Sequence, residues 1–330
     1  MDDADIPAII GLLTASLGPG PGGADRRELF EWKHLRSPFG RSLALVAETE
    51  GRPVGLRTFM RWRLRTSRAP GDIVAVRAVD TVTSSDVRRR GVFSSLTDAA
   101  VAACEDEGIA LVFNTPNDKS LPVYLKMGWQ EVIRWPMRLK VRRPDRLLLA
   151  AARRELTAGS SVRPPAGSAL LPAAEMLERP EAEGFVAGLV TPSSGWFTPR
   201  TIDYLRWRYV RCPLPYHALV DGDPPRAMIL ARLRSRGRLR EAVVCEALCE
   251  PGSESVLGLL LRRIASEAAV DHAVAHFGEG WPSAGALAKA GFRSIGRLSM
   301  TFTVRPVRRV TPDPLDPRSW SLSLGDLEVF

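Results

Sequence analysis

The sequence repeats itself, and this repetition constrains the fold more than any other feature. The segment WKHLRSP at 32–38 is echoed by WRYVRCP at 207–213, an offset of 175 residues. A second echo pairs KMGW at 126–129 with KAGF at 289–292. Because the two echoes occur in the same order, we predict a duplicated domain whose second copy is slightly shorter than the first.

Both copies continue from the first echo into alternating apolar residues broken by a turn. The first copy has apolar stretches at 42–47 and 54–56 around a Gly-Arg-Pro turn. The second has stretches at 216–220 and 227–230 around an Asp-Gly-Asp-Pro-Pro turn. Each pattern predicts a β-hairpin.

The remainder of the first copy predicts strands that alternate with helices. We expect helices near 6–17, 92–107 and 121–127, and strands near 73–82, 109–114 and 130–141. The fold class is therefore α/β (α+β), with two tandem domains that each have a mixed central sheet flanked by helices.

Composition shifts give the domain boundaries. We expect a first domain at 1–147, a linker at 148–174 rich in Pro, Gly and Ser, and a second domain at 175–305. The tail at 306–330 is expected to pack on the domains, because it ends in apolar residues, namely Trp320, Leu322, Leu324, Leu327 and Phe330.

Composition also excludes several classes of protein. No run of 18 apolar residues occurs and the first residues are acidic, so we expect no membrane span and a cytoplasmic location. The four cysteines form no CxxC motif, and His272 and His276 lack a third ligand, so no metal is expected. The net charge of +9 fits a solvated surface in an arginine-rich chain or an anionic ligand, and basic residues are scattered among acids. A phosphorylated small molecule fits this better than a nucleic acid.

One turn has the character of a phosphate-binding loop. Arg88, Arg89, Arg90 and Gly91 stand between an apolar strand and an amphipathic helix that opens with Val92, Phe93 and Ser94. Backbone N–H groups and the positive end of the helix dipole bind phosphate at such a position.

Together with a motif further on, this loop resembles the GNAT family of acyl-CoA-dependent acyltransferases. The downstream motif comprises Asn117, Ser120, Tyr124, Gly128 and Trp129. In the loop, Arg88 and Gly91 match the family pattern, but Phe93 replaces its final small residue. The stretch 79–86 is similar to that of one GNAT subgroup, and the whole resemblance covers roughly residues 40–140.

The resemblance implies acetyl-CoA, or another acyl-CoA, as co-substrate. The N–H groups of residues 89–94 would hold the pyrophosphate, and the main chain of 81–83 would pair with the pantetheine amides. Tyr124 would protonate the departing thiolate, although it could also be an interior tyrosine. Asn117 could support the cofactor or cap the following helix. The implied cofactor-binding residues are Thr81, Val82, Thr83, Arg88, Arg89, Arg90, Gly91, Val92, Phe93, Ser94, Asn117, Ser120 and Tyr124.

An ammonium acceptor must lose a proton before it attacks, so a carboxylate or an ordered water is expected as base. Asp80 and Glu48 are the candidate catalytic carboxylates. Asp80 could instead fix local structure, and Glu48 could be only a strand-end charge.

The second copy has lost the signals of a cofactor site. Its loop at 250–259 has no arginine before the turn, contains a proline and carries two glutamates that would repel a pyrophosphate. Leu287 stands where the first copy has Tyr124. We therefore predict a degenerate GNAT-like domain that packs against the first and walls the acceptor cleft.

The predicted function is N-acyl transfer, with acetyl as the expected group, to a primary amine of a small molecule. An amino sugar, an aminoglycoside-like antibiotic or a biosynthetic intermediate would suit a two-domain cleft. The alternatives are a protein or peptide N-acetyltransferase, a non-catalytic acyl-CoA-binding or scaffold protein, and a malonyl-CoA decarboxylase. The oligomeric state and the acyl length stay open.

Overall fold

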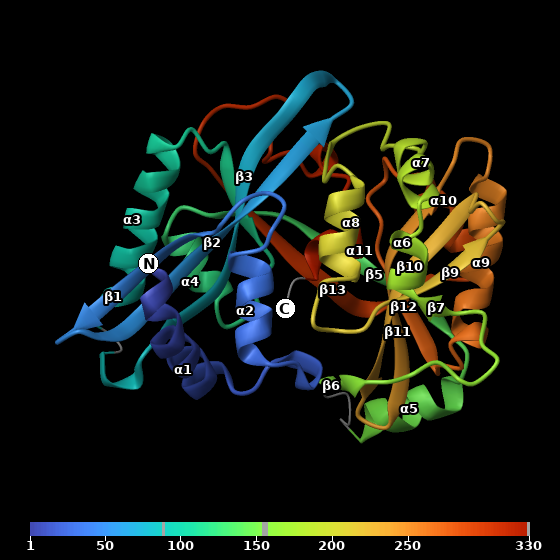
Figure 1. Ribbon diagram of the computed structural model, residues 1–330, viewed down its shortest axis with the longest axis horizontal. Helices are drawn as coiled ribbons and strands as arrows, with labels where there is room; N and C mark the ends of the chain where they lie inside the picture. The colour runs from blue at the N-terminus through green and yellow to red at the C-terminus, as the bar shows by residue number, and fades with distance from the viewer. Residues whose placement is uncertain (88–89, 154–157, 329–330) are drawn as a thin grey trace.

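The computed structural model describes residues 1–330 except 88–89, 154–157 and 329–330. Two halves with the same order of elements lie side by side (Figure 1). The first half consists of α1 (Ile6–Leu17), α2 (Arg26–His34), β1 (Leu43–Thr49), β2 (Arg52–Thr66), β3 (Ala69–Thr83), α3 (Val92–Asp106), β4 (Leu111–Asn114), α4 (Leu121–Lys126) and β5 (Gln130–Val141). From α2 onward the second half repeats this order as α8 (Ile202–Tyr209), β9 (His217–Asp221), β10 (Ala227–Arg236), β11 (Leu239–Cys249), α9 (Glu254–Glu267), β12 (His272–Ala275), α10 (Pro282–Lys289) and β13 (Arg293–Pro306).

Shorter elements join and close the two halves. The segment 148–174, expected as a linker, contains the end of a helix and two short strands. The connecting and closing elements are α5 (Pro144–Ala152), β6 (Ala158–Ser161), β7 (Leu171–Pro172), α6 (Ala173–Leu177), α7 (Glu181–Ala187), β8 (Trp196–Phe197) and α11 (Leu324–Leu327).

The predicted fold class is confirmed, and several boundaries agree to the residue. The helix predicted at 6–17 is α1, which ends where Gly18 takes a φ of 74°. The strand predicted at 130–141 is β5. The predicted hairpins are β1–β2 and β9–β10, both antiparallel.

The sheets of the two halves join into one sheet of 13 strands. Its order is β1-β2-β3-β4-β13-β5-β12-β11-β10-β9-β7, with β6 and β8 on the side. Strand β13 of the second half lies between β4 and β5 of the first, and β5 lies between β13 and β12. Each half therefore contributes its last strand to the sheet of the other (Figure 1).

The repeated tryptophans meet where the halves join. Trp32 on α2 donates from Nε1 to the carbonyl oxygen of Trp207 at 2.7 Å, and Trp207 on α8 donates to the carbonyl oxygen of Trp32 at 2.9 Å. Their rings are stacked with centroids 4.9 Å apart. Both indoles are buried, so neither N–H can bond to water. Each one instead finds its hydrogen-bond acceptor in the other repeat.

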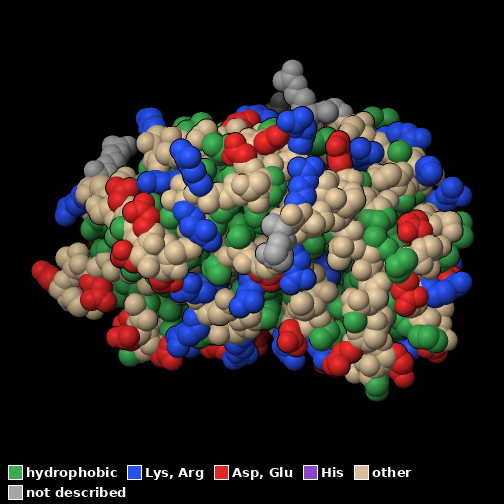
Figure 2. Space-filling model, turned by 90° about the horizontal axis from the view of Figure 1, so that it is seen from above, with side chains coloured by type: hydrophobic (Ala, Val, Ile, Leu, Met, Phe, Trp, Pro, Cys, Tyr) green, Lys and Arg blue, Asp and Glu red, His purple; other side chains and the backbone are tan. Residues whose placement is uncertain are grey.

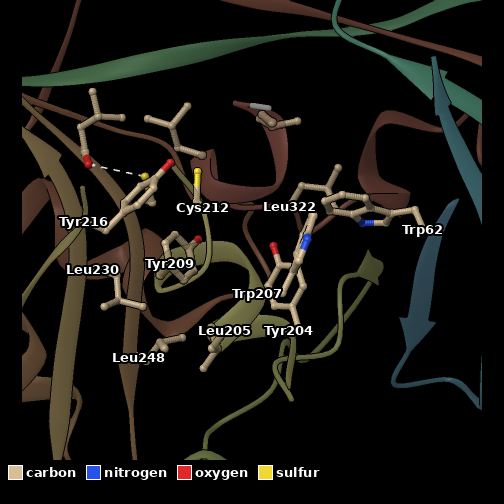
Figure 3. Packing of buried hydrophobic residues seen from close by; sticks show 14 of the residues in the cluster. Trp62, Tyr204, Leu205, Trp207, Tyr209, Cys212, Tyr216, Leu230, Leu248 and Leu322 are labelled. Carbon is tan, nitrogen blue, oxygen red and sulfur yellow. Dashed lines mark hydrogen bonds between the residues drawn. The ribbon is translucent and has the colours of Figure 1, made fainter. Parts of the chain in front are cut away.

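The largest apolar core spans both halves. It combines Trp62 of β2 with Tyr204 and Trp207 of α8 and with Leu322 of the tail (Figure 3). Trp320, Leu322, Leu324 and Leu327 of the tail are buried, and Phe330 lies outside the described residues. Arg77 of β3 donates to the carbonyl oxygens of Asp326 and Leu327, which ties the tail to the first half.

The surface carries mixed charge. On the face shown in Figure 2, acidic side chains are interspersed among the basic ones. In the part of the chain that the structure describes, no helix is long and apolar enough to cross a membrane.

Candidate acyl-CoA site

The sheet opens beside the end of β3. Parallel pairing of β3 with β4 is limited to Val76↔Val112 and Arg77↔Phe113. Strand β4 ends at Asn114, whereas β3 stays paired with β2 as far as Thr83. On its β4 side, the main chain of residues 81–83 is therefore unpaired with any described strand, and an extended ligand can add to it.

A cavity of about 530 Å³ occupies this opening. Its walls come from the end of β3, the start of α3 and the start of α4. The lining residues are Thr81, Val82, Thr83, Val87, Gly91, Val92, Phe93, Ser94, Ser120, Val123 and Tyr124. Most of the cofactor-binding residues expected from the sequence are thus brought to one cavity.

Helix α3 presents its N-terminus to the cavity. Gly91, with a φ of 78°, precedes the helix, and no side chain caps it. The first intrahelical hydrogen bond runs from Ser95 N to Gly91 O, so the preceding N–H groups have no helical acceptor. Such groups bind anions. Arg88 and Arg89 lie outside the described residues, and Arg90 is exposed.

The hydroxyl of Tyr124 is held by a buried guanidinium. Arg57 Nη1 donates to the Tyr124 hydroxyl oxygen at 2.9 Å. The Tyr124 ring packs edge-on against Phe93 and Trp129, and only 7% of the residue is exposed. Since the oxygen already accepts from Arg57, the phenolic proton is free to be donated elsewhere.

Arg57 was not foreseen from the sequence. It is fully buried on β2, donates to Thr81 Oγ1 as well, and lies over the rings of Phe59 and Tyr124. Its Nε and Nη2 are buried and have no hydrogen-bond partner among the described residues. A lone arginine within the apolar run 54–60 was the only available signal, and in an arginine-rich chain it does not stand out.

Asp80 lies at a bulge in β3 and faces α2 instead of lining the cavity. Its φ is 41°, and its Oδ2 accepts from Lys33 Nζ at 2.5 Å and from His34 Nε2 at 2.9 Å. Burial raises the pKa of Asp80, but the charge of Lys33 and the hydrogen bond from His34 outweigh it and hold that pKa well below the usual range. Burial lowers the pKa of His34.

Two further predicted residues, Glu48 and Asn117, do not line the cavity. Glu48 is exposed on the edge strand β1, opposite Pro53, and does not line the cavity. Asn117 Oδ1 accepts from the backbone N–H groups of Lys119 and Ser120, each at 3.0 Å, just before α4. That geometry is the one expected of a local cap.

The equivalent region of the second half is built differently. A cavity of about 510 Å³ there is lined by α9 and α10 alone, including Glu254 and Lys289, and no residue of β11 contributes. Leu287, at the position of Tyr124, is buried in the core.

An open strand edge, an uncapped helix N-terminus and a buried tyrosine meet at one cavity, and this arrangement is the one expected of an acyltransferase. The comparisons with known proteins support the same class. Residues 1–132 match the model of the acetyltransferase (GNAT) domain. Over these residues the chain is similar to the GNAT acetyltransferases.

Solved structures share the fold. A probable N-acyltransferase from Enterococcus faecalis and a GCN5-related N-acetyltransferase from Anabaena variabilis each superpose with a TM-score of 0.59 at 11% identity, over 93% of this chain and 71% of theirs. Eis1 from Mycobacterium abscessus superposes with a TM-score of 0.53 at 13% identity, over 93% of this chain and 72% of its own. No curated protein matches the chain significantly in sequence.

Proposed function

We propose that the chain transfers an acyl group, acetyl in the first instance, from CoA to a primary amine of a small molecule. The observation that carries this proposal is the cavity of about 530 Å³ on which the edge of β3, the start of α3 and Tyr124 converge. The edge of β3 suits the pantetheine amides, and the start of α3 suits the pyrophosphate. The proposed organisation is a catalytic domain at 1–147, a linker at 148–174, a degenerate domain at 175–305 and a packed tail.

In the proposed reaction the amine nitrogen attacks the thioester carbonyl carbon, the C–N bond forms and the C–S bond breaks. The thiolate takes the phenolic proton of Tyr124. Arg57 supports this role, because its positive charge lies beside the oxygen on which negative charge develops. The proton lost by the amine passes to water in this scheme, since Asp80 is engaged by Lys33 and Glu48 does not line the cavity.

The proposal includes one acyl-CoA site per chain. In the second half, Glu250 and Glu254 flank the turn that corresponds to the phosphate-binding loop, and a pyrophosphate would be repelled there. Leu287 cannot donate a proton.

Calorimetry with CoA and thiol release from acetyl-CoA test this function together. We expect one CoA per chain with micromolar affinity, about −7 to −8 kcal/mol. Tyr124→Phe should lower turnover by roughly 10- to 10000-fold and leave CoA affinity nearly intact. Two CoA sites, or full turnover in Tyr124→Phe, would contradict the assignment. CoA binding without turnover on any amine or peptide would identify a binding protein, and turnover on peptides alone would identify a peptide acetyltransferase.

A further inference from the structure

A second cavity, of about 470 Å³, lies where the two halves join. The loop that follows β4, residues 115–118, lines it, and the helix after that loop lines the acyl-CoA cavity. The strands β4, β13, β5 and β12 are antiparallel in succession, so the start of β12 lies at the same edge of the sheet as the end of β4. The two cavities therefore share that edge and the segment between them.

About half of the residues that line this cavity are apolar. Met137 and Leu139 come from β5, Val243 from β11, Val274 from β12 and Met300 from β13. Both halves thus build the cavity, and a ligand gains affinity when its apolar surface is removed from water against these side chains.

A carboxylate–imidazole pair lines the same cavity. Glu241 Oε1 lies 2.9 Å from His272 Nε2, and Glu241 Oε2 accepts from Arg234 Nε at 2.5 Å. Arg234 also donates to Glu328 at 2.6 Å, so a chain of charges is held together at the cavity wall. Because the carboxylate of Glu241 accepts both bonds, the proton of a neutral His272 ring belongs on Nε2.

That assignment leaves Nδ1 of His272 as a hydrogen-bond acceptor without a partner. His272 is 3% exposed and lines the cavity, and its Nδ1 is buried and makes no hydrogen bond to any described residue. A buried acceptor without a hydrogen bond is destabilising, so a ligand that donates a hydrogen bond to it gains affinity.

We propose that this cavity binds the acceptor, that the acceptor is an amine carried on an apolar body, and that His272 accepts a hydrogen bond from one of its N–H or O–H groups. The proposal rests on the proposed acyl transfer and narrows its substrate class from primary amines in general to amphiphilic ones. His272 is a substrate-binding residue in this scheme. Glu241 is a positioning residue, because it fixes the tautomer and the orientation of the ring.

The test uses the full chain, acetyl-CoA and two probes, tryptamine and glucosamine, with thiol release as the readout. Tryptamine should have the higher kcat/KM. In His272→Gln the KM for tryptamine should rise about 10-fold while CoA affinity stays unchanged. His276→Gln is the matched control, since His276 is also buried, follows directly after the end of β12 and does not line the cavity.

A second variant keeps the test decisive if His272→Gln folds poorly. Met300 is half-buried, so Met300→Trp should fill the cavity and abolish turnover of tryptamine without loss of CoA binding. An unchanged KM in both variants, a preference for glucosamine, or no turnover of tryptamine by a chain that binds CoA would overturn the inference. Loss of CoA binding in the unmodified chain would instead overturn the proposed function.

Discussion

At the scale of single residues, the cavity proposed to bind acyl-CoA depends on how buried charges are placed. Arg57 and Asp80 lie on neighbouring strands at the bulge of β3, but their side chains contact different elements. Arg57 donates to Tyr124, which lines the cavity, whereas Asp80 binds Lys33 and His34 of α2. A buried charge is tolerated only with partners, so each of these contacts fixes an element as well as a side chain.

Arg57→Met should lower turnover by about 10- to 100-fold and leave CoA affinity within about 3-fold, because the cation beside the Tyr124 oxygen is lost while the hydrophobic volume is kept. Steady-state kinetics and calorimetry measure both quantities. Arg63→Met is the matched control, since Arg63 lies on the same strand and is exposed. Equal turnover in the two variants would show that Arg57 does not act on the chemistry.

The stability contributed by Glu241 should depend on pH. Burial raises the pKa of Glu241, but the hydrogen bond with His272 and the charge of Arg234 outweigh it and lower that pKa to about 2, from 4.5. The stabilisation is therefore complete above pH 4.5 and is lost as the pH falls toward 2. Urea unfolding should show Glu241→Gln to be less stable than the parent at pH 7, with a smaller difference at pH 3. A difference that grows on acidification would contradict the assigned ion pair, and the exposed Glu178→Gln should show none.

At the scale of elements, the start of α3 is the feature that suits the first half to bind an anion. The helix is 15 residues long, and its N-terminus faces the cavity with no side chain in the capping position. The corresponding α9 begins at Glu254, so a carboxylate takes the place that an anion would need. A helix dipole attracts phosphate only where its first turn is free.

Gly91→Asp should abolish CoA binding, because it places a carboxylate at the start of α3 and forces a residue with a side chain into a φ of 78°. Calorimetry measures the loss. Gly71→Asp is the control, since Gly71 has a φ of 86°, is exposed and lies away from the cavity. If both variants lose affinity equally, backbone strain and not charge at the helix explains the result.

At the scale of the whole molecule, the exchange of the last strands makes the halves interdependent. Strand β13 lies between β4 and β5 of the first half. Without β13, β4 and β5 are no longer joined through a strand that pairs with both. The indole N–H of Trp32 also loses its acceptor when the second half is absent. Unpaired strand edges and exposed apolar core favour aggregation.

A fragment of residues 1–150 should therefore aggregate or bind acetyl-CoA without turning over the acceptor, whereas the same fragment coexpressed with residues 158–330 should form a soluble one-to-one complex. Size-exclusion chromatography and circular dichroism follow both outcomes. A monomeric 1–150 fragment that acylates the same amine at the parent rate would show that the second half contributes nothing to the chemistry.

The sequence alone determined the local structure and the duplication. Helix α1 and strand β5 were predicted to the residue because apolar periodicity and a terminal glycine are encoded within each segment. Most of the positions expected from the loop, the helix start and the tyrosine line one cavity, and their binding of acyl-CoA stays a prediction.

The tertiary structure alone decided which strands are neighbours and which buried charges meet. The residues 130–141 do not reveal that β13, more than 150 residues further on, pairs with this strand. Several strand edges could pair with it, and the segment itself does not distinguish among them. Arg57 and Tyr124 are 67 residues apart, and the partners Glu241 and His272 are 31 apart. Such contacts form only when the whole sheet assembles. The free energy of that assembly comes from interactions along the whole chain, so no single segment encodes it.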